Sequence, residues 1–392
     1  MKICVVTTWP PYREGIAIYS SKLYLEMSKN KKIKISIIAN KIDQQSFYRD
    51  KSDLQVHRCW QRGPLALSQI LKTAIKSEAH ILHLQHGWLL YGGPFTALSF
   101  ASLMLLLRLR LKTLVLTMHT IILRNAKFFK SKLLNCLTNI VIFTITKLMI
   151  LFASRVIVLN TAMKKTLIQH YACKESKVVV IPHGVDKVEE TFCQTNAPEK
   201  IDEINILSLG FLREDKGLEY LIDAFKKLQT SYPQVTLTLA GGVHPHNHDD
   251  YFNRIKNKIA ELKSLNRIIV TNFLSESMLN EVIQKADIII LLSQETKYLE
   301  ASGALARVID FNKPVICTRI PKFMSELTHG YNCLMVNPHS SDEIYNAAEI
   351  LLENVELRKN IATNLKKLFE GRSWSFVAQK HVELYKSLLK VS

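Results

Sequence analysis

Two cations and two glycines follow an apolar segment in the second half of the chain, in an arrangement that can bind phosphate. The segment 204–209 ends at Gly210, Arg213 and Lys216 lie in the following turn, and Gly217 precedes an amphipathic helix. The start of a helix presents unpaired backbone N–H groups, and neighbouring cations add positive charge. The spacing therefore predicts an anion site, most naturally for a phosphate group.

Further polar residues stand where other apolar segments end. His119 closes the segment 113–119, and an imidazole can both donate and accept a hydrogen bond near neutral pH. Gly241 follows the segment 235–240, where a glycine allows close approach of the backbone to a ligand. Ser302 and Gly303 stand at a predicted helix start and are expected to contact a diphosphate.

Short apolar strands alternate with helical segments along the whole chain, which predicts parallel sheets covered by helices. The expected strands of the first half are 3–8, 33–39, 81–85, 113–119, 155–159 and 178–182, and those of the second half are 204–209, 235–240, 267–270, 288–292, 315–318 and 334–336. We therefore predict an α/β protein with two doubly wound domains, 1–186 and 204–373, joined by a polar linker at 187–203. Ligands of such sheets bind at the carboxyl ends of the strands.

The positive charge of this 392-residue chain lies in its first half. Residues 1–186 hold 27 Lys+Arg and 8 Asp+Glu, a net +19, whereas residues 187–392 hold 25 and 26, a net −1. This asymmetry indicates an anionic partner for the first half. Seven scattered cysteines without a Cys-x-x-Cys pair favour a reducing cytoplasm, and the N-terminus reads as a strand, so no signal peptide is expected.

Apolar content distinguishes the candidate partners. The segments 100–111 and 133–153 are apolar with embedded cations, and neither has the length of clean apolar sequence that a transmembrane helix needs. They are read either as basic helices on an anionic membrane surface or as buried helices of the domain, and both interpretations stay open. Nucleic acid is not expected as a partner, because no recognition motif is present.

These motifs together resemble those of the retaining glycosyltransferases of family four, which have the GT-B arrangement of two Rossmann-like domains facing across a cleft. The resemblance covers nearly the whole chain. It is carried by a glycine loop at 10–19, Thr117–Thr120, the Pro-His-Gly-Val-Asp segment 182–186, Gly210–Gly217, Tyr298–Ala304 and Trp374–Phe376. It implies that the last helix, 374–392, packs back on the first domain.

The resemblance also implies a function. It implies transfer of a hexose from a UDP- or GDP-linked sugar to a glycan or polyprenyl-linked acceptor. The nucleotide sugar would be a co-substrate, and the reaction would need neither a cofactor nor a metal. The first domain would bind the acceptor and the second the donor. His119, Glu300 and Lys216 would be catalytic, and the expected donor-binding residues are Gly15, Arg213, Lys216, Gly241, Asn272, Phe273, Glu295, Glu300, Ser302 and Gly303.

The chain departs from the family pattern at several positions. Phe211 stands where the family has an arginine, and Arg213 is expected to supply the guanidinium instead. Arg307 stands at the place of the second family glutamate, so the ribose contact is not carried over, and Glu295 competes with Glu300 as the sugar-binding carboxylate. Glu14 replaces one glycine of the first loop.

Three other interpretations were weighed. The histidines in 244–250 could bind zinc or nickel, but an exposed loop is the favoured interpretation. A sugar-nucleotide 2-epimerase would share the fold, although the Lys216–Gly217 motif and Trp374 argue against it. A basic scaffold without activity is the non-enzymatic alternative. The expected location is the cytoplasm, on the inner face of the cell membrane.

Overall fold

The chain forms two units in the computed structural model. The first contains Met1–Gly184, Lys297–Ala301 and Arg372–Ser392, and the second contains Val185–Thr296 and Ser302–Gly371. The structure describes residues 1–42, 47–49, 54–110, 113–188, 203–243, 250–262, 267–294 and 297–391. Most of the expected linker, 187–203, lies outside these residues.

The first unit is built on an eight-stranded sheet in the order β3-β4-β2-β1-β5-β6-β8-β9. All neighbours are parallel except β3 and β4. The strands are β1 Lys2–Val6, β2 Lys34–Asn40, β3 Phe47–Arg49, β4 Gln55–Trp60, β5 Ile81–His86, β6 Thr113–Met118, β8 Arg155–Val158 and β9 Val178–Val180. Every residue of β5 is buried, as expected for a strand covered on both faces.

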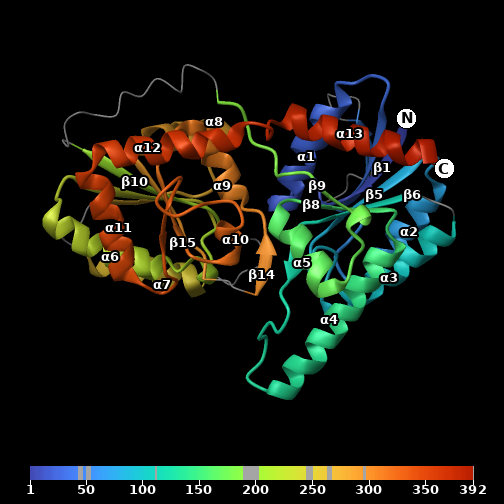
Figure 1. Cartoon of the computed structure of the whole chain (residues 1–392), viewed down its shortest axis with the longest axis horizontal. Helices are drawn as coiled ribbons and strands as arrows, with labels where there is room; N and C mark the ends of the chain where they lie inside the picture. Colours follow the sequence, from blue (N-terminus) through green and yellow to red (C-terminus); the bar gives the residue numbers. More distant parts are fainter. Residues whose placement is uncertain are drawn as a thin grey trace. The chain divides into compact units, whose positions relative to one another are not determined.

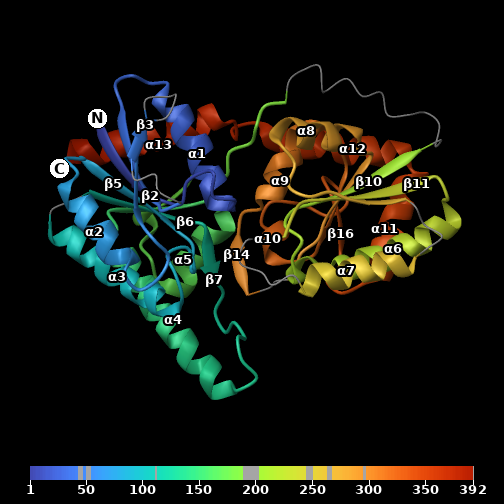
Figure 2. The same cartoon turned by 180° about the vertical axis from the view of Figure 1, so that it is seen from behind.

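Helices cover both faces of this sheet (Figures 1 and 2). They are α1 Gly15–Ser28, α2 Ala66–Lys76, α3 Pro94–Leu109, α4 Lys132–Phe152, α5 Thr161–Tyr171 and α13 Trp374–Val391. The last helix, α13, packs against α1 and buries Tyr385 in the first core. The final segment of the chain therefore completes the first unit.

The second unit has a six-stranded sheet, β12-β11-β10-β13-β15-β16, in which all neighbours are parallel. Its strands are β10 Ile204–Leu209, β11 Val235–Ala240, β12 Ile268–Val270, β13 Ile288–Leu291, β15 Val315–Thr318 and β16 Leu334–Val336. Its helices are α6 Leu218–Ser231, α7 Asp250–Glu261, α8 Glu276–Lys285, α9 Gly303–Val308, α10 Pro321–Met324, α11 Ser341–Glu353 and α12 Val355–Lys366. The helices again lie on both sides of the sheet (Figure 1). The predicted α/β class with two parallel-sheet domains is confirmed.

One strand belongs to a different unit from the one that the predicted domain boundaries give it. Strand β14, Tyr298–Glu300, pairs antiparallel with β7, Thr120–Ile122, and both belong to the first unit. The sequence predicts that residues 204–373 form the second domain without interruption. The physical reason for the difference is Leu299, which is buried in the first core, so the chain crosses to the first unit for five residues and returns.

Candidate active site

The phosphate-binding loop expected in the second unit has a defined local structure. Strand β10 ends before Gly210, the short 3-10 turn Glu214–Lys216 follows, and Gly217 leads into α6. Gly217 has a φ of 60°, and a Cβ there would lie 2.1 Å from the side-chain nitrogen of Gln294. Glycine suits this left-handed position, and any side chain there would have to displace Gln294. It holds the turn close to the start of α6.

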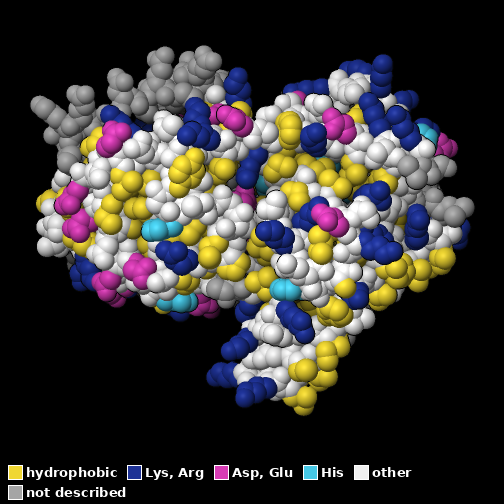
Figure 3. All heavy atoms as spheres, in the orientation of Figure 1, with side chains coloured by type: hydrophobic (Ala, Val, Ile, Leu, Met, Phe, Trp, Pro, Cys, Tyr) yellow, Lys and Arg dark blue, Asp and Glu magenta, His cyan; other side chains and the backbone are white. Residues whose placement is uncertain are grey.

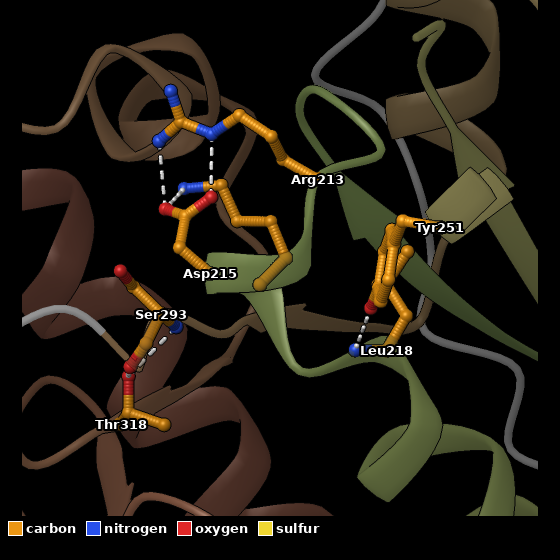
Figure 4. Close-up of polar contacts among 7 residues, drawn as sticks. Arg213, Asp215, Leu218, Tyr251, Ser293 and Thr318 are labelled. Atoms are coloured by element: carbon orange, nitrogen blue, oxygen red, sulfur yellow. Dashed lines mark hydrogen bonds and ion pairs between the residues drawn. The ribbon is translucent and has the colours of Figure 1, made fainter. Parts of the chain in front are cut away.

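Three charged side chains of this turn interact. Arg213 donates from Nε and Nη2 to the two carboxylate oxygens of Asp215, at 2.5 and 2.7 Å, as Figure 4 shows. The Lys216 Nζ lies 3.4 Å from Asp215 Oδ2. Burial alone would raise the pKa of Asp215, but the Arg213 hydrogen bonds and the charge of Lys216 outweigh it and hold that pKa at about 2. The cluster carries a net charge of +1 at neutral pH.

Neighbouring backbone surrounds a small pocket beside this cluster. A Cβ at Gly241 would lie 1.8 Å from the Gly210 carbonyl oxygen, so the two glycine turns touch. The Leu212 N–H donates to the Gly242 carbonyl at 3.0 Å, and Phe211 meets Phe273 edge to face. The pocket is lined by Ser208, Leu209, Gly210, Phe211, Leu212, Lys216, Leu218, Leu239 and Leu292. Lys216 thus borders a small pocket whose walls are both polar and apolar.

Hydrogen bonds fix the elements around this loop. The Leu218 N–H, at the start of α6, donates to Tyr251 Oη at 3.0 Å (Figure 4). The Ser293 N–H donates to Thr318 Oγ1 at 3.0 Å, and that hydroxyl donates to the Ser293 carbonyl at 2.8 Å (Figure 4). Strands β13 and β15 are thereby tied together at their carboxyl ends, where a ligand of this sheet would bind.

The predicted ligand Ser302 caps a helix. Its Oγ accepts a hydrogen bond from the Leu305 N–H at 3.2 Å, and Gly303 is the first residue of α9. Arg307, later in α9, forms ion pairs with Asp186 and Glu276. The guanidinium is therefore engaged by two carboxylates of the second unit.

In the first unit, His119 directly follows β6. Its Nε2 lies 2.7 Å from Gln85 Oε1. An amide oxygen only accepts, so Nε2 carries the proton and Nδ1 carries the lone pair. Burial, aided by the charges of His183, His86 and His381, lowers the pKa of His119 to about 3. His119 is thus a neutral imidazole at physiological pH, able to accept a hydrogen bond from a hydroxyl but not to act as a cation.

Behind His119 lies a buried network that sequence reasoning missed. The Gln85 Nε2 donates to Tyr24 Oη at 2.7 Å, and this hydroxyl lies 2.8 Å from His83 Nδ1. The same His83 nitrogen lies 2.5 Å from Tyr385 Oη of α13. The network orients Gln85 and through it fixes the His119 ring. A signal for this network was present in the sequence, because polar residues alternate with apolar ones along β5. The sequence pattern alone indicates only a buried strand there.

Glu300 lies on the ribbon that begins next to His119. It pairs in register with Thr120, whose Oγ1 donates to Glu300 Oε2 at 3.4 Å. Tyr19 stacks edge to face against His119 and against His183. The structure therefore brings two predicted catalytic residues, His119 and Glu300, into one unit, and this differs from the expected assignment of Glu300 to the donor domain.

Gly15, the remaining first-domain prediction, is the first residue of α1. A side chain there would meet no atom within 4 Å, so the space in front of this helix start is open. The preceding residue is Glu14, which the sequence pattern marks only as a replacement of a family glycine. Burial raises the pKa of its carboxyl despite a hydrogen bond to Thr8 and the charge of Arg62. This partly buried carboxyl lies at the start of α1 and is a candidate contact for sugar hydroxyls.

The other predicted ligands belong to the second unit, and their roles stay predictions. They are Arg213, Lys216, Gly241, Asn272, Phe273, Ser302 and Gly303. Glu295 and the histidine-rich segment 244–249 lie outside the described residues. Among the residues that the structure does describe, no group of three or more His, Cys, Asp and Glu side chains has the arrangement to hold a metal ion.

Comparison with known proteins identifies the family. Residues 15–189 match the model "Glycosyltransferase Family 4", and residues 189–368 match "Glycosyl transferases group 1". An uncharacterized glycosyltransferase of Methanocaldococcus jannaschii is 25% identical over 252 residues, which cover 60% of this chain and 61% of that relative. The match therefore spans less than two thirds of the relative's length.

Solved structures share the fold over the full chain. Sucrose-phosphate synthase of Thermosynechococcus elongatus gives a TM-score of 0.78 at 17% identity, with 100% of both chains covered. Anabaena HepE, solved in complex with UDP-glucose, gives a TM-score of 0.71 at 18% identity, covering 99% of this chain and 100% of the other. At such identities the likeness establishes the GT-B fold and leaves the substrates of this chain to its own residues.

Proposed function

The chain belongs to glycosyltransferase family four, and on that premise we propose that it transfers a hexose from a nucleotide-diphosphate sugar, with retention of configuration, to a glycan or lipid-linked acceptor. The observation that carries the proposal is the Arg213–Asp215–Lys216 cluster beside the pocket that follows β10. Two cations next to backbone at a helix start suit the diphosphate of a UDP- or GDP-linked donor. HepE, which has the same fold, was solved with UDP-glucose.

The cluster also suits the chemical step. When the bond between the sugar C1 and the β-phosphate oxygen breaks, the electron pair stays on the diphosphate and its negative charge grows. Arg213 and Lys216 would stabilise that charge, because cations already held in place beside the leaving group need no reorganisation as the charge develops. We propose that these cations fill the role of a metal, so that transfer is metal-independent.

The first unit would bind the sugar hydroxyls. His119 presents the Nδ1 lone pair of a neutral imidazole, and Glu300 presents a carboxylate on the adjoining ribbon. Both groups accept hydrogen bonds, which is what a hydroxyl-rich hexose requires. In the proposed reaction the acceptor oxygen forms the new bond to C1 on the face that the diphosphate leaves, and the acceptor proton passes to the departing phosphate oxygen. No protein nucleophile takes part.

The acceptor follows from the charge of the first unit. A net +19 over residues 1–186 favours an anionic acceptor, and a phosphate-linked polyprenyl glycan has both the charge and the apolar tail. Such an acceptor lies in a membrane, and scattered cysteines without a Cys-x-x-Cys pair fit a reducing compartment. We therefore propose a cytoplasmic enzyme peripheral to the inner face of the cell membrane.

The donor site is tested by thermal-shift titration with UDP, GDP, ADP and their common sugar conjugates. One nucleotide should raise the Tm of the native protein, and Lys216→Ala should lose most of this shift. Lys226→Ala, an exposed lysine on the same strand-turn-helix unit, is the matched control and should retain it. If no nucleotide shifts the Tm, the transferase proposal fails and a non-catalytic scaffold becomes the better interpretation.

The sugar contacts are tested separately. Glu300→Gln should lower turnover of the nucleotide sugar by about tenfold to a hundredfold while leaving the shift by the free nucleotide unchanged, because the carboxylate is proposed to touch only the sugar. Product analysis of the same reactions distinguishes a glycosyltransferase, which releases nucleoside diphosphate, from a 2-epimerase, which returns an isomeric sugar. A Glu300→Gln variant with native turnover would remove Glu300 from the site.

A further inference from the structure

Helix α4 is apolar on two opposite faces, and only one of them is covered. Ile142, Ile145 and Met149 face the protein and are at most 8% exposed. On the other side, exposed apolar residues at one angular position of the helix form a stripe that only Thr144 interrupts. Its members are Leu133 (69% exposed), Leu137 (52%), Ile140 (56%), Leu148 (37%) and Leu151 (64%).

The neighbouring helix α3, which packs against α4, continues this surface. Leu98, Leu105 and Leu109 are 42%, 38% and 67% exposed and follow the same helical spacing. Figure 3 shows apolar side chains along one edge of α4 and over the adjoining helix, with Lys and Arg side chains on its other edge. We name the exposed apolar residues of α3 and α4 the α3–α4 stripe. Surface apolar residues are normally scattered singly, so a stripe of this length indicates a binding surface.

Cations stand at both ends of the α3–α4 stripe. Lys127, Lys130 and Lys132 are exposed around the start of α4, next to the exposed ring of Phe129. Twelve Lys or Arg and no Asp or Glu occur between Glu78 and Glu175. The surface therefore combines apolar side chains with positive charge, as a helix lying at the boundary of an anionic bilayer does.

A second group of cations lies near the other end of α4. The Lys177 Nζ donates to the carbonyl of Leu151 at 2.8 Å. Burial lowers the pKa of Lys177, and the nearby charges of Arg108, Arg155 and Lys174 add to this effect. These cations lie close enough together to repel one another. An anionic ligand along the surface would relieve that repulsion.

We propose that the α3–α4 stripe is the surface by which the protein docks on an anionic lipid bilayer, with the helix in the membrane plane. By length and composition α4 could also cross a membrane. Spanning would pull Ile145, Met149 and the rest of the inner face out of the first core, so the in-plane arrangement is the one compatible with the fold. A second copy of the chain would bring like charges together, whereas anionic headgroups complement them.

This proposal rests on the proposed function only for its purpose, which is to bring the enzyme to a lipid-linked acceptor. It is tested by flotation of the full-length protein with vesicles of phosphatidylcholine alone or mixed with phosphatidylglycerol. Binding should need the anionic lipid and weaken at high salt. Replacing Lys127, Lys130 and Lys132 by Gln should weaken binding by about fivefold for each lysine.

The apolar contribution is tested by Leu133→Gln, Leu137→Gln and Ile140→Gln combined in one protein, which should weaken vesicle binding more than about tenfold. The matched control changes three exposed apolar residues of the second unit, Met278, Met324 and Ile350, to Gln and should bind as the native protein does. Nucleotide thermal shift on each variant reports the donor site independently. Vesicle binding and nucleotide binding can therefore fail separately.

Cys136 allows the contact to be located, because it is exposed on α4. In a background with Cys59 and Cys193 replaced by Ser, an environment-sensitive fluorophore on Cys136 should shift its emission to the blue on anionic vesicles. Absence of vesicle binding by the native protein, or equal binding by native and stripe variants, would overturn the proposal. So would a native dimer that the stripe variants convert to monomer, because the stripe would then be a self-interface.

Discussion

Replacing Asp215 by Asn tests the physical interpretation of the charged loop. The carboxylate is held by two hydrogen bonds from Arg213 and by the charge of Lys216, which bring its pKa from 3.8 to about 2. A shift of about 1.8 pKa units corresponds to about 2 kcal/mol of preference for the charged form in the folded state. We expect Asp215→Asn to lower the free energy of unfolding by that amount at neutral pH.

The sign of the pH dependence follows from the lowered pKa. The folded-state pKa of Asp215 is depressed, so its contribution is complete above the unfolded value of 3.8 and is lost as the pH falls through about 2. The difference in unfolding free energy between native protein and Asp215→Asn should therefore shrink between those pH values. Urea denaturation across this range measures it.

The same substitution should change nucleotide binding in the opposite direction. Without the carboxylate, the net charge of the Arg213–Asp215–Lys216 cluster rises from +1 to +2, and a diphosphate no longer competes with Asp215 for the two cations. Charges about 4 Å apart near a protein surface interact by about 4 kcal/mol, most of which is offset by desolvation. We expect the nucleotide to bind about tenfold more tightly, and so to stabilise Asp215→Asn more than the native protein.

Asp223→Asn is the matched control, because Asp223 forms an exposed ion pair with Lys258 on the same domain. It should change the unfolding free energy by less than about 1 kcal/mol and leave nucleotide binding unchanged. Weaker nucleotide binding by Asp215→Asn would refute the reasoning, because the carboxylate would then hold Arg213 and Lys216 in place for the ligand. Equal destabilisation by both variants would show that the buried pairing contributes nothing special.

The remaining predictions concern the first unit. Gly184→Ala would place a Cβ 2.4 Å from the ring of Trp374 and should destabilise the protein by about 1–3 kcal/mol in urea, whereas Gly93→Ala, with no atom within 4 Å, should change little; equal effects would disprove the close packing. Burial lowers the pKa of His381 from 6.5 to about 4, so the unfolded chain binds a proton that the folded one excludes, and stability should fall as the pH drops through this range. In the His381→Leu variant, the slope of the unfolding free energy against pH should be smaller by about 1.4 kcal/mol per pH unit. The control His80→Gln, at an exposed position, should leave this slope unchanged. Identical slopes in native and His381→Leu protein would contradict the role of His381.

The strands that the sequence predicts are mostly apolar, and charged residues stand only at or next to their ends. Every expected strand is present, because strands buried on both faces need no alternation to be recognised. Strand β4 escaped prediction since Arg58 and His57 interrupt it, yet Arg58 is buried and donates to the carbonyls of Asn40 and Pro10. A charged residue that is buried through backbone hydrogen bonds looks, in the sequence, like a surface residue.

The local structure of the loop around Lys216 was also predictable, since it depends on neighbouring residues. Strand end, cations, glycine and helix start lie within a few residues of one another, and Gly217 has the left-handed conformation that its place requires. The ribbon that carries Glu300 was not predictable in the same way. Its position depends on Leu299, which packs in the first core although the residues before and after this segment belong to the second unit. A three-residue strand carries too little pattern to reveal its partner.

The orientation of His119 was beyond sequence reasoning, and it matters most for the proposed chemistry. Its ring is held through Gln85 and Tyr24 by a network that includes His83 and ends at Tyr385, 302 residues further along the chain than His83. The last helix therefore supports His119, the histidine that we propose to contact the sugar, through this network. Burial keeps the His119 imidazole neutral, and the network orients its ring. Loss of α13 contacts should therefore damage catalysis before it damages the second unit, and nucleotide binding should survive it.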